Sequence, residues 1–312
     1  MSLIEEAAKR LEQLRNTGVE IPESTTSSQT NSAMNGGAQH DSSADVVYDG
    51  VQNKSFKEAV DFSVLEGAGY LTPSSPKSTL AEEYRIIKRP LISNAVGKGS
   101  ALVDQGNLIM VTSAMPGEGK TFTAINLAIS IAMEMDTTVM LVDADVSKPS
   151  VLKAFGLKPG RGLLDALSAD SLDISSMLIK TKINKLTILP SGTMHPRATE
   201  LLASEAMLRL LEDMANRYPD RMIIFDSPPL LQTTEARVLA SHMGQIVLVV
   251  AAEQTMHSQV NQAIEMIDSC PVKLLVLNRA RPGPLDRYGY GYGYGYGYGY
   301  GHEHAQQASQ SR

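Results

Sequence analysis

Tryptophan is absent from this chain of 312 residues, and cysteine occurs only once, at Cys270. A single cysteine excludes a disulfide framework within the chain, and this cysteine usage is typical of proteins in a reducing compartment. Cys270 comes just before a strand-like apolar run. We therefore expect it to be a small core residue and not a nucleophile.

A basic excess and long apolar runs are also missing. The formal net charge of −6 argues against a general nucleic-acid binder, because such proteins usually carry a basic footprint. The longest apolar runs, "IVLVVAA" and "LLVLN", have the length of buried strands and are too short for a bilayer-spanning helix. The N-terminus lacks the apolar core of a signal peptide. These absences predict a cytoplasmic protein that can still dock on a partner at the inner face of the cell membrane.

Four segments differ in composition. Residues 1–21 alternate apolar and charged side chains at helical spacing, which predicts an amphipathic helix for docking or self-association. Residues 22–77 are expected to be a disordered linker, because most of this stretch is rich in Ser, Thr, Asn and Gly and poor in large apolar side chains. Residues 78–286 carry the regular patterns of a folded domain, and residues 287–312 are expected to be a flexible tail rich in Tyr and Gly.

The predicted domain begins with a helix capped by Ser78 or Thr79, and Pro90 lies inside it, where a kink is expected. Short Val/Ile/Leu runs then alternate with helical stretches; the runs are "NLIMVTS", "TVMLVD", "LTILPS", "MIIFDS", "IVLVVAA" and "KLLVLN". Several of them are apolar at consecutive positions, as in strands that are covered on both faces. The pattern predicts a doubly wound, mostly parallel α/β sheet flanked by helices.

The segment "VTSAMPGEGKTFTAINLAIS" fits the P-loop pattern, with an apolar strand before it and a helix after it. Glycines in such a loop let backbone N–H groups turn toward phosphate oxygens, and the helix N-terminus adds its positive end. The pattern predicts a P-loop NTPase in which Lys120 reaches the β- and γ-phosphates of ATP and the Thr121 hydroxyl holds Mg²⁺. The residues expected to contact the nucleotide here are Pro116, Gly117, Glu118, Gly119, Lys120, Thr121 and Phe122.

Acidic side chains follow two of the predicted strands. One run ends on Asp143 and Asp145, and another ends on Asp226. In a parallel sheet these strand ends share the edge at which ligands bind. A single aspartate after a strand is more often a helix N-cap, but three of them beside a P-loop favour a metal site. We expect Thr121, Asp143 and Asp226 to hold Mg²⁺.

In this order, the motifs "SAMPGEGKT", "LVDADVSKP" and "DSPPLL" resemble the Walker A, Walker A′ and Walker B motifs of the bacterial tyrosine kinases. The resemblance covers about residues 78–301 and is closest to the kinases of exosortase-associated exopolysaccharide clusters. It implies an ATP- and Mg²⁺-dependent protein-tyrosine autokinase that regulates exopolysaccharide polymerisation and export. It also implies that Lys120, Asp143, Asp145 and Asp226 are catalytic, with Asp145 accepting the phenol proton, and that Asn278 faces the adenine.

Two further segments match the resemblance. Glu82, Arg85 and Lys88 match the family's Glu-x2-Arg-x2-Arg/Lys motif, which implies an interface in a homo-oligomeric ring. Without the family, the same triplet is equally well read as a solvated helix face. The repeat "YGYGYGYGYGYGYG" stands where the family has its tyrosine cluster. The implied autophosphorylation sites are Tyr288, Tyr290, Tyr292, Tyr294, Tyr296, Tyr298 and Tyr300.

The family resemblance also implies partners. The tail is expected to enter the active site of a neighbouring copy, and a membrane chain-length-determinant protein is expected to activate the kinase. A tyrosine phosphatase is expected to reverse the modification. Three departures bear on nucleotide affinity and rate: Val146-Ser147-Lys148 replaces more basic residues, Glu235 replaces an Asp, and no Arg stands in "EQTMHSQVNQ".

Two other classes of protein share the expected fold. One is a ParA/MinD-like positioning ATPase, but such proteins carry a signature lysine where this chain has Met115, and they need no tyrosine repeat. The other is a non-catalytic scaffold gated by nucleotide, against which the retained lysine and aspartates argue. Both remain alternatives to the autokinase.

Overall fold

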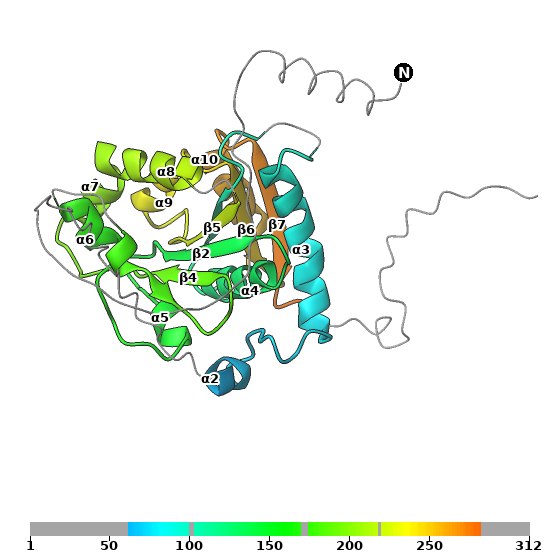
Figure 1. Cartoon of the computed structure of the whole chain (residues 1–312). Coiled ribbons are helices and arrows are strands. Elements are labelled where there is room, and N and C mark those ends of the chain that lie inside the picture. Colours follow the sequence, from blue (N-terminus) through cyan, green and yellow to red (C-terminus); the bar gives the residue numbers. More distant parts are fainter. Residues whose placement is uncertain (1–61, 100–102, 170–173, 218–219, 282–312) are drawn as a thin grey trace, which may run out of the picture. The chain divides into compact units, whose positions relative to one another are not determined.

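The computed structural model describes residues 62–99, 103–169, 174–217 and 220–281. All of them belong to the unit Gln52–Arg312, and they form one sheet with helices on both faces (Figure 1). The strands are β1 (Leu108–Ser113), β2 (Thr138–Asp143), β3 (Ile179–Lys180), β4 (Leu186–Leu189), β5 (Arg221–Asp226), β6 (Gln245–Ala251) and β7 (Val272–Asn278).

The strand order in the sheet is β3-β4-β2-β5-β1-β6-β7. Every neighbouring pair runs parallel except β3 and β4, so the predicted doubly wound parallel sheet is confirmed. The six runs expected from the sequence all form strands, and β3 is an additional strand of two residues. The central strands β1 and β5 are buried at nearly every position, because helices cover both of their faces.

The helices divide between the two faces. One core cluster packs side chains of α2, α3, α4 and α5 against one face, and the other packs those of α6 to α10 against the opposite face. These helices are α2 (Phe62–Gly67), α3 (Thr79–Ala95), α4 (Lys120–Ala132), α5 (Val151–Ala154), α6 (Leu163–Ser168), α7 (Ala198–Leu202), α8 (Glu205–Arg217), α9 (Thr234–Ala240) and α10 (His257–Met266), with a short 3-10 turn η1 (Ser175–Met177).

Helix α3 begins where the sequence predicts. Ser78 is its N-cap, and the Ser78 hydroxyl accepts a hydrogen bond from the Ala81 N–H at 3.2 Å. The helix continues through Pro90 to Ala95. Its C-terminal half is tied to the sheet by Gln245, whose buried side-chain amide donates to the carbonyl of Leu91 at 2.9 Å. The helix is thereby fixed against the same sheet that carries the P-loop.

The linker expected at residues 22–77 is shorter than predicted at its C-terminal end. Helix α2 and the chain that follows it pack on the domain, with Leu65 and Leu71 buried in the core that faces α4. The Leu71 N–H donates to Asn126 of α4 at 2.7 Å. The reason is local: this end of the segment supplies large apolar side chains that the stretch from 23 to 56 lacks. The rest of the expected linker and the N-terminal helix lie outside the described residues.

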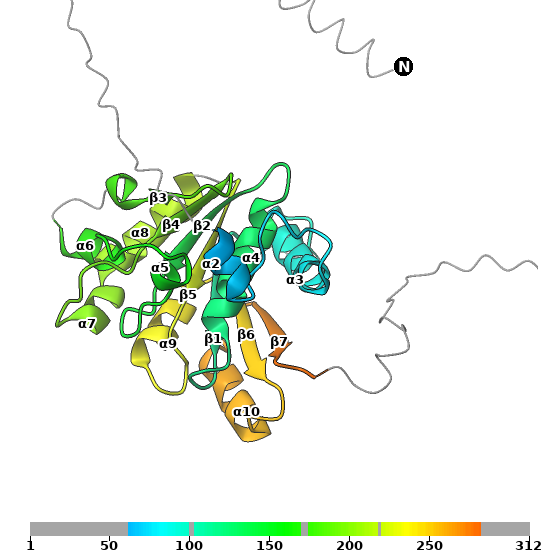
Figure 2. The same ribbon diagram turned by 90° about the horizontal axis from the view of Figure 1, so that it is seen from below.

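Cys270 is buried, and its thiol donates to the carbonyl of Val272 at 3.3 Å, as expected for a core residue. Among the described residues, no helix has the length and apolar character needed to cross a bilayer. Strand β7 differs from the central strands. It lies at the end of the sheet beside β6 and next to α10 (Figure 2), and its residues are half-buried or exposed.

Candidate functional site

The P-loop connects β1 to α4, and its two inner glycines have a left-handed backbone. Gly117 has φ of 83° and Gly119 has φ of 98°, a region that favours glycine. At Gly119 a Cβ atom would also lie 2.0 Å from Nδ2 of Asn278. Position 119 therefore requires glycine twice, for its backbone angle and for its close neighbour.

Two side chains brace this loop from within the fold. Glu118 is buried; one of its oxygens accepts from the Met115 N–H at 2.8 Å, and the other accepts from the Thr255 hydroxyl. The Asn278 amide donates to the Glu118 carbonyl at 2.8 Å. Asn278, expected at the adenine, thus lies against the phosphate loop. Thr255 was not singled out from the sequence, because no short motif marks a residue that acts across 137 positions.

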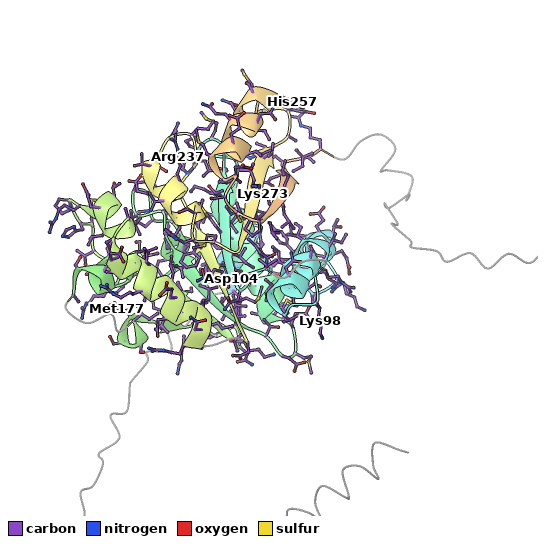
Figure 3. The ribbon with its side chains drawn as sticks, turned by 90° about the horizontal axis from the view of Figure 1, so that it is seen from above. Lys98, Asp104, Met177, Arg237, His257 and Lys273 are labelled. Atoms are coloured by element: carbon purple, nitrogen blue, oxygen red, sulfur yellow. The ribbon has the colours of Figure 1, made fainter. Side chains whose placement is uncertain are left out.

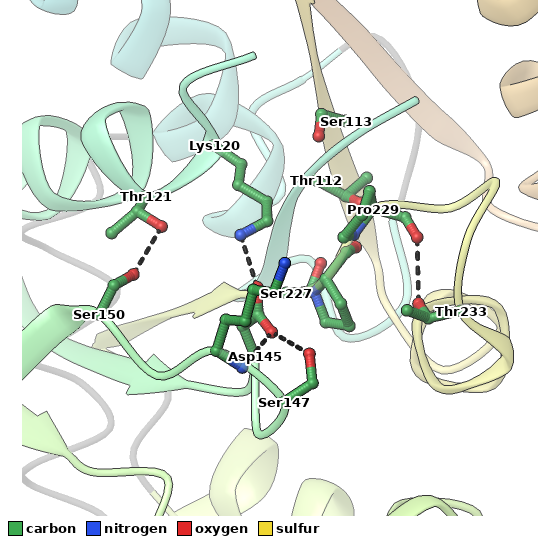
Figure 4. A network of polar contacts seen from close by, with 12 residues as sticks. Thr112, Ser113, Lys120, Thr121, Asp145, Ser147, Ser150, Ser227, Pro229 and Thr233 are labelled. Atoms are coloured by element: carbon green, nitrogen blue, oxygen red, sulfur yellow. Dashed lines mark hydrogen bonds and ion pairs between the residues drawn. The ribbon is translucent and has the colours of Figure 1, made fainter. Parts of the chain in front are cut away.

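Lys120 and Asp145 form a close ion pair at the start of α4 (Figure 4). The ammonium nitrogen lies 2.6 Å from Oδ2 of Asp145, and both side chains are largely buried. The other oxygen of Asp145 accepts from the Ser147 hydroxyl at 2.8 Å and from the Lys148 N–H at 3.1 Å. Three donors therefore hold this carboxyl group in place beside the P-loop lysine.

Asp143 and Asp226 end the adjacent strands β2 and β5 and face each other in register. Oδ2 of Asp143 accepts from the N–H groups of Ser150 and Val151, both at 3.0 Å, whereas its Oδ1 has no hydrogen-bond partner. Asp226 is fully buried, and neither of its oxygens has a partner. Buried polar groups are nearly always paired, so these three oxygens mark a place where a ligand is expected.

The surroundings shift the pKa of both carboxyl groups upward. Burial raises the pKa of Asp226 to about 7, with Lys120 opposing the shift and the negative charge of Asp143 adding to it. Burial likewise raises the pKa of Asp143 to about 6, against the lowering effect of the Val151 and Ser150 N–H groups. A bound cation would reverse both shifts, because it stabilises the ionised carboxylates.

The residues fit a magnesium ion that shares its coordination with a nucleotide. The Thr121 hydroxyl lies 3.1 Å from the Ser150 hydroxyl, at the same edge of the sheet as the unpaired aspartate oxygens. Within the described residues, no three His, Cys, Asp or Glu side chains gather into a metal site of their own. This suits Mg²⁺, which commonly binds through one or two carboxylates, waters and substrate phosphates.

An aromatic pair and a cleft flank the site. The ring of Phe122, in the first turn of α4, lies 5.2 Å from the ring of Tyr70, between centroids. Burial and the negative charge of Asp226 raise the pKa of Tyr70. A cleft of about 580 Å³ also reaches Asp143 and has apolar walls that include Leu152. Tyr70 was missed from the sequence because it falls within the expected linker.

The three residues of the expected interface differ in their exposure to solvent. Glu82 and Arg85 pair with each other on the exposed surface of α3. Lys88 is buried, and its ammonium donates to the Ser130 carbonyl and pairs with Glu134, each at 2.6 Å. Lys88 is thus used within its own protomer, because it points toward α4 and not away from it. The seven tyrosines of the repeat lie outside the described residues.

Comparison with known proteins agrees with this geometry. Residues 106–275 match the protein family described as AAA domain. The tyrosine-protein kinase YwqD of Bacillus subtilis (strain 168) is 35% identical over 218 residues, which cover 69% of this chain and 88% of that protein. The succinoglycan biosynthesis transport protein ExoP of Rhizobium meliloti (strain 1021) is 29% identical over 75% of this chain, which spans 29% of ExoP.

A solved structure gives the same result. The crystal structure of the chimerical protein CapA2B2 is 31% identical in sequence, with a TM-score of 0.58, and the match covers 71% of this chain and 92% of that one. The P-loop, the paired strand-end aspartates and the parallel sheet as far as Leu275 of β7 lie within the matched family region. The chain therefore belongs to the bacterial tyrosine-protein kinases.

Proposed function

We propose that this protein is an ATP-dependent protein-tyrosine autokinase that phosphorylates the tyrosines of its own C-terminal repeat. The observation that carries the proposal is the pairing of Lys120 with Asp145 beside the unpaired oxygens of Asp143 and Asp226. One buried edge of the sheet thereby brings together a P-loop lysine, a candidate base and a candidate cation site. Phosphoryl transfer mainly requires this kind of positioning and charge neutralisation.

The nucleotide phosphates are bound by the loop from Pro116 to Thr121, with Phe122 and Asn278 at its borders. Thr121, Asp143 and Asp226 hold Mg²⁺, which when bound neutralises charge on the phosphates. The two aspartates are suited to this because three of their buried oxygens have no partner, and their ionised forms need a positive charge nearby. The Asp143 carboxylate is oriented by the N–H groups of Ser150 and Val151.

Lys120 changes its partner during the cycle. Without nucleotide its ammonium is bound to Asp145. Arrival of the phosphates gives the ammonium a second, more highly charged partner, and Oδ2 of Asp145 is then released. The freed oxygen accepts the phenol proton while the phenol oxygen bonds to the γ-phosphorus and the bond to the leaving ADP oxygen breaks. Asp145 is thus the general base, held in place by Ser147 and the Lys148 N–H.

The acceptor tyrosine comes from the tail of a neighbouring copy. The cleft beside Asp143 has apolar walls that suit a phenol ring, and Lys153 at its rim attracts the negative charge of a modified tail. A repeat of fourteen residues spans at most about 50 Å when extended, enough to reach a second protomer. Glycine beside each tyrosine lets any of the seven phenols enter without one fixed backbone conformation.

The kinase acts on exopolysaccharide polymerisation and export at the cytoplasmic face of the membrane. Support comes from ExoP, whose name places that relative in succinoglycan biosynthesis and transport. A membrane chain-length-determinant protein activates the kinase, and a tyrosine phosphatase resets it. Copies assemble into a ring through the exposed pair of Glu82 and Arg85 on α3.

Intact and peptide mass spectrometry after incubation with Mg-ATP tests this function, with Lys120→Met as the matched control. Phosphates on residues 288–300 of the wild type, absent from the control, are the expected result. ATP hydrolysis with an unmodified repeat, even with the membrane partner added, would point to a positioning ATPase. Failure of both hydrolysis and modification would favour a scaffold.

A further inference from the structure

Strand β7 has an open edge. It pairs with β6 on one side, and no strand among the described residues pairs with its other side. An open edge is a site at which another chain can add a strand, and proteins usually cover or blunt it. Here the edge carries the run "KLLVL", in which Lys273 is the only charged side chain to discourage pairing.

The free backbone groups of this edge can be assigned. The Asn278 carbonyl accepts from the Ala252 N–H at 2.9 Å, so the polar groups of Asn278 point toward β6. Backbone groups in a strand point to alternate sides. Lys273, Leu275 and Leu277 therefore direct their N–H and C=O groups outward, away from the sheet.

The side chains of the same residues line an apolar groove. Leu275 is 55% exposed and Leu277 is 63% exposed, whereas Leu274 and Val276 pack on the core at the other face. A groove of about 510 Å³ runs between β7 and α10, and Leu275, Leu277 and Ile264 are among its walls. Figure 3 marks the two elements that flank it, with Lys273 on β7 and His257 at the start of α10.

The chain itself continues from this edge with a segment of strand period. The described residues end three positions after β7, and the repeat of residues 288–301 begins within ten residues of Asn278. Strict alternation of Tyr and Gly places every phenol on one face of an extended strand and leaves the other face without side chains. Residues between them include two prolines and a glycine, which favour a reversal of chain direction.

We propose that the Tyr-Gly repeat of the chain binds antiparallel to the open edge of its own β7, with its tyrosines over the groove between β7 and α10. Opposite residues of an antiparallel pair point to the same face, so tyrosines opposite Leu275 and Leu277 lie on those leucines. The same pairing joins the outward N–H and C=O groups of both leucines to tyrosine backbone groups. Glycines then lie opposite Leu274 and Val276.

The register explains why the repeat is so regular. Lys273, Leu275 and Leu277 each meet a tyrosine in five registers, with Leu277 opposite Tyr288, Tyr290, Tyr292, Tyr294 or Tyr296. A slip of one residue is excluded, because it would put glycine on the leucines. Glycine weakens any strand, so the bound repeat exchanges readily between these registers. Different tyrosines are therefore unbound at different times. The edge of β7 is then occupied by the tail of the same chain, and no second copy is needed.

Pairing of the repeat with β7 is separate from the kinase reaction, since it forms without nucleotide. It covers an edge that would otherwise invite aggregation, and it withholds the phenols from a neighbouring active site. Phosphate on a phenol adds about −1.5 to −2 charges above an apolar groove, and this releases the repeat. The edge therefore distinguishes unmodified from modified tails.

Amide hydrogen exchange by NMR on the full chain without nucleotide tests the proposal. The amides of Leu275 and Leu277 are expected to exchange at least about tenfold more slowly than in a chain with all seven repeat tyrosines changed to serine. The amides of Leu274 and Val276, which point toward β6, serve as internal controls and keep their rates. Leu277→Asp is expected to accelerate exchange at the Leu275 amide. Met135→Asp, at an exposed site in the loop between α4 and β2, is the matched control and should leave that exchange rate unchanged.

Two results would overturn the proposal. Equal exchange at Leu275 and Leu277 with tyrosine and with serine in the repeat would show that the edge is not covered by the phenol-bearing strand. Protection that increases with protein concentration would assign the edge to the tail of a second copy. The experiment uses no nucleotide, so its result does not depend on whether the protein phosphorylates its tail.

Discussion

Asp226 illustrates how one residue meets opposing demands from folding and function. Its carboxyl group is fully buried at the end of a central strand, with both oxygens unpaired. An ionised group in such a place destabilises the fold unless a cation compensates it. The neighbouring Thr112 and Ser227 hydroxyls bond to the carbonyls of Pro228 and Val111 and hold the turn after Asp226 in place.

Asp226→Asn is expected to change stability in a pH-dependent way when nucleotide and Mg²⁺ are absent. The folded pKa of about 7 lies above the ordinary value of 3.8, so the fold favours the neutral acid and loses stability as pH rises between these values. Asparagine removes this loss. The unfolding free energy of the variant relative to wild type should grow by about 2–4 kcal/mol from pH 4 to pH 8. Urea unfolding in EDTA measures it, and a pH-independent difference would contradict the raised pKa.

Asp145→Asn tests the general base. It keeps the size of the side chain but removes its ability to take the phenol proton, so the autophosphorylation rate should fall by about 10²–10⁴-fold. Nucleotide affinity should not fall, since phosphate no longer has to displace the Asp145 carboxylate from Lys120. Ser147→Ala, which removes only one of the hydrogen bonds to Asp145, is the matched control and should have a smaller effect. An unchanged single-turnover rate for Asp145→Asn would exclude this base.

At the scale of elements, α3 uses charged residues for two different tasks. Lys88 is only 5% exposed and ties α3 to α4 through the Ser130 carbonyl and Glu134. Arg85, one turn earlier, pairs with Glu82 on the surface. The spacing of the three residues is the same in the sequence, but only the packing of α3 on α4 decides which of them is buried.

Replacing these two cations separates the two tasks. Lys88→Met should lower the free energy of unfolding by about 1–3 kcal/mol, because it leaves a buried carbonyl without its donor. Arg85→Ala should cost less than about 0.5 kcal/mol, as is usual for an exposed pair, but should reduce the assembled mass. Urea unfolding and light scattering distinguish the two effects. Normal assembly in Arg85→Ala would argue against a ring built through this face.

The P-loop offers a second matched pair. Both Gly117 and Gly119 have positive φ, but a Cβ atom meets nothing within 4 Å at Gly117 and meets Asn278 at Gly119. Gly117→Ala should therefore cost only backbone strain, about 1–2 kcal/mol. Gly119→Ala should cost more and also weaken nucleotide binding, since it displaces the Asn278 amide from the loop. Calorimetric titration with ATP and thermal unfolding measure both, and equal losses would contradict the contact.

At the scale of the whole molecule, we expect charge to control the proposed assembly. Seven phosphotyrosines add roughly −10 to −14 charges to a chain whose formal net charge is −6. Tails that lie in neighbouring sites would then repel one another. Light scattering before and after Mg-ATP should show a fall in assembled mass, less at high salt because of screening. Lys120→Met should keep its mass, and an unchanged wild-type mass with fully modified tails would contradict release by charge.

Much of the architecture was predictable, because its signals are local. The six apolar runs that form parallel strands, the cap at Ser78 and the P-loop glycines each depend on a few consecutive residues. Strand β3, with two residues, is too short to leave a pattern. Helix α2 was assigned to the linker because its neighbours are polar, although Leu65 is buried.

The sequence by itself determined the chemical groups of this protein: a phosphate loop, strand-end carboxylates and a repeat of tyrosines. Only the tertiary structure decided their partners. It paired Lys120 with Asp145 and left the carboxyl oxygens of Asp226 without a hydrogen-bond partner. It also turned Asn278 toward the P-loop and buried Lys88. The physical reason is that a motif fixes the chemistry and spacing of neighbouring residues, whereas burial and contact depend on which distant segments the packed sheet brings together.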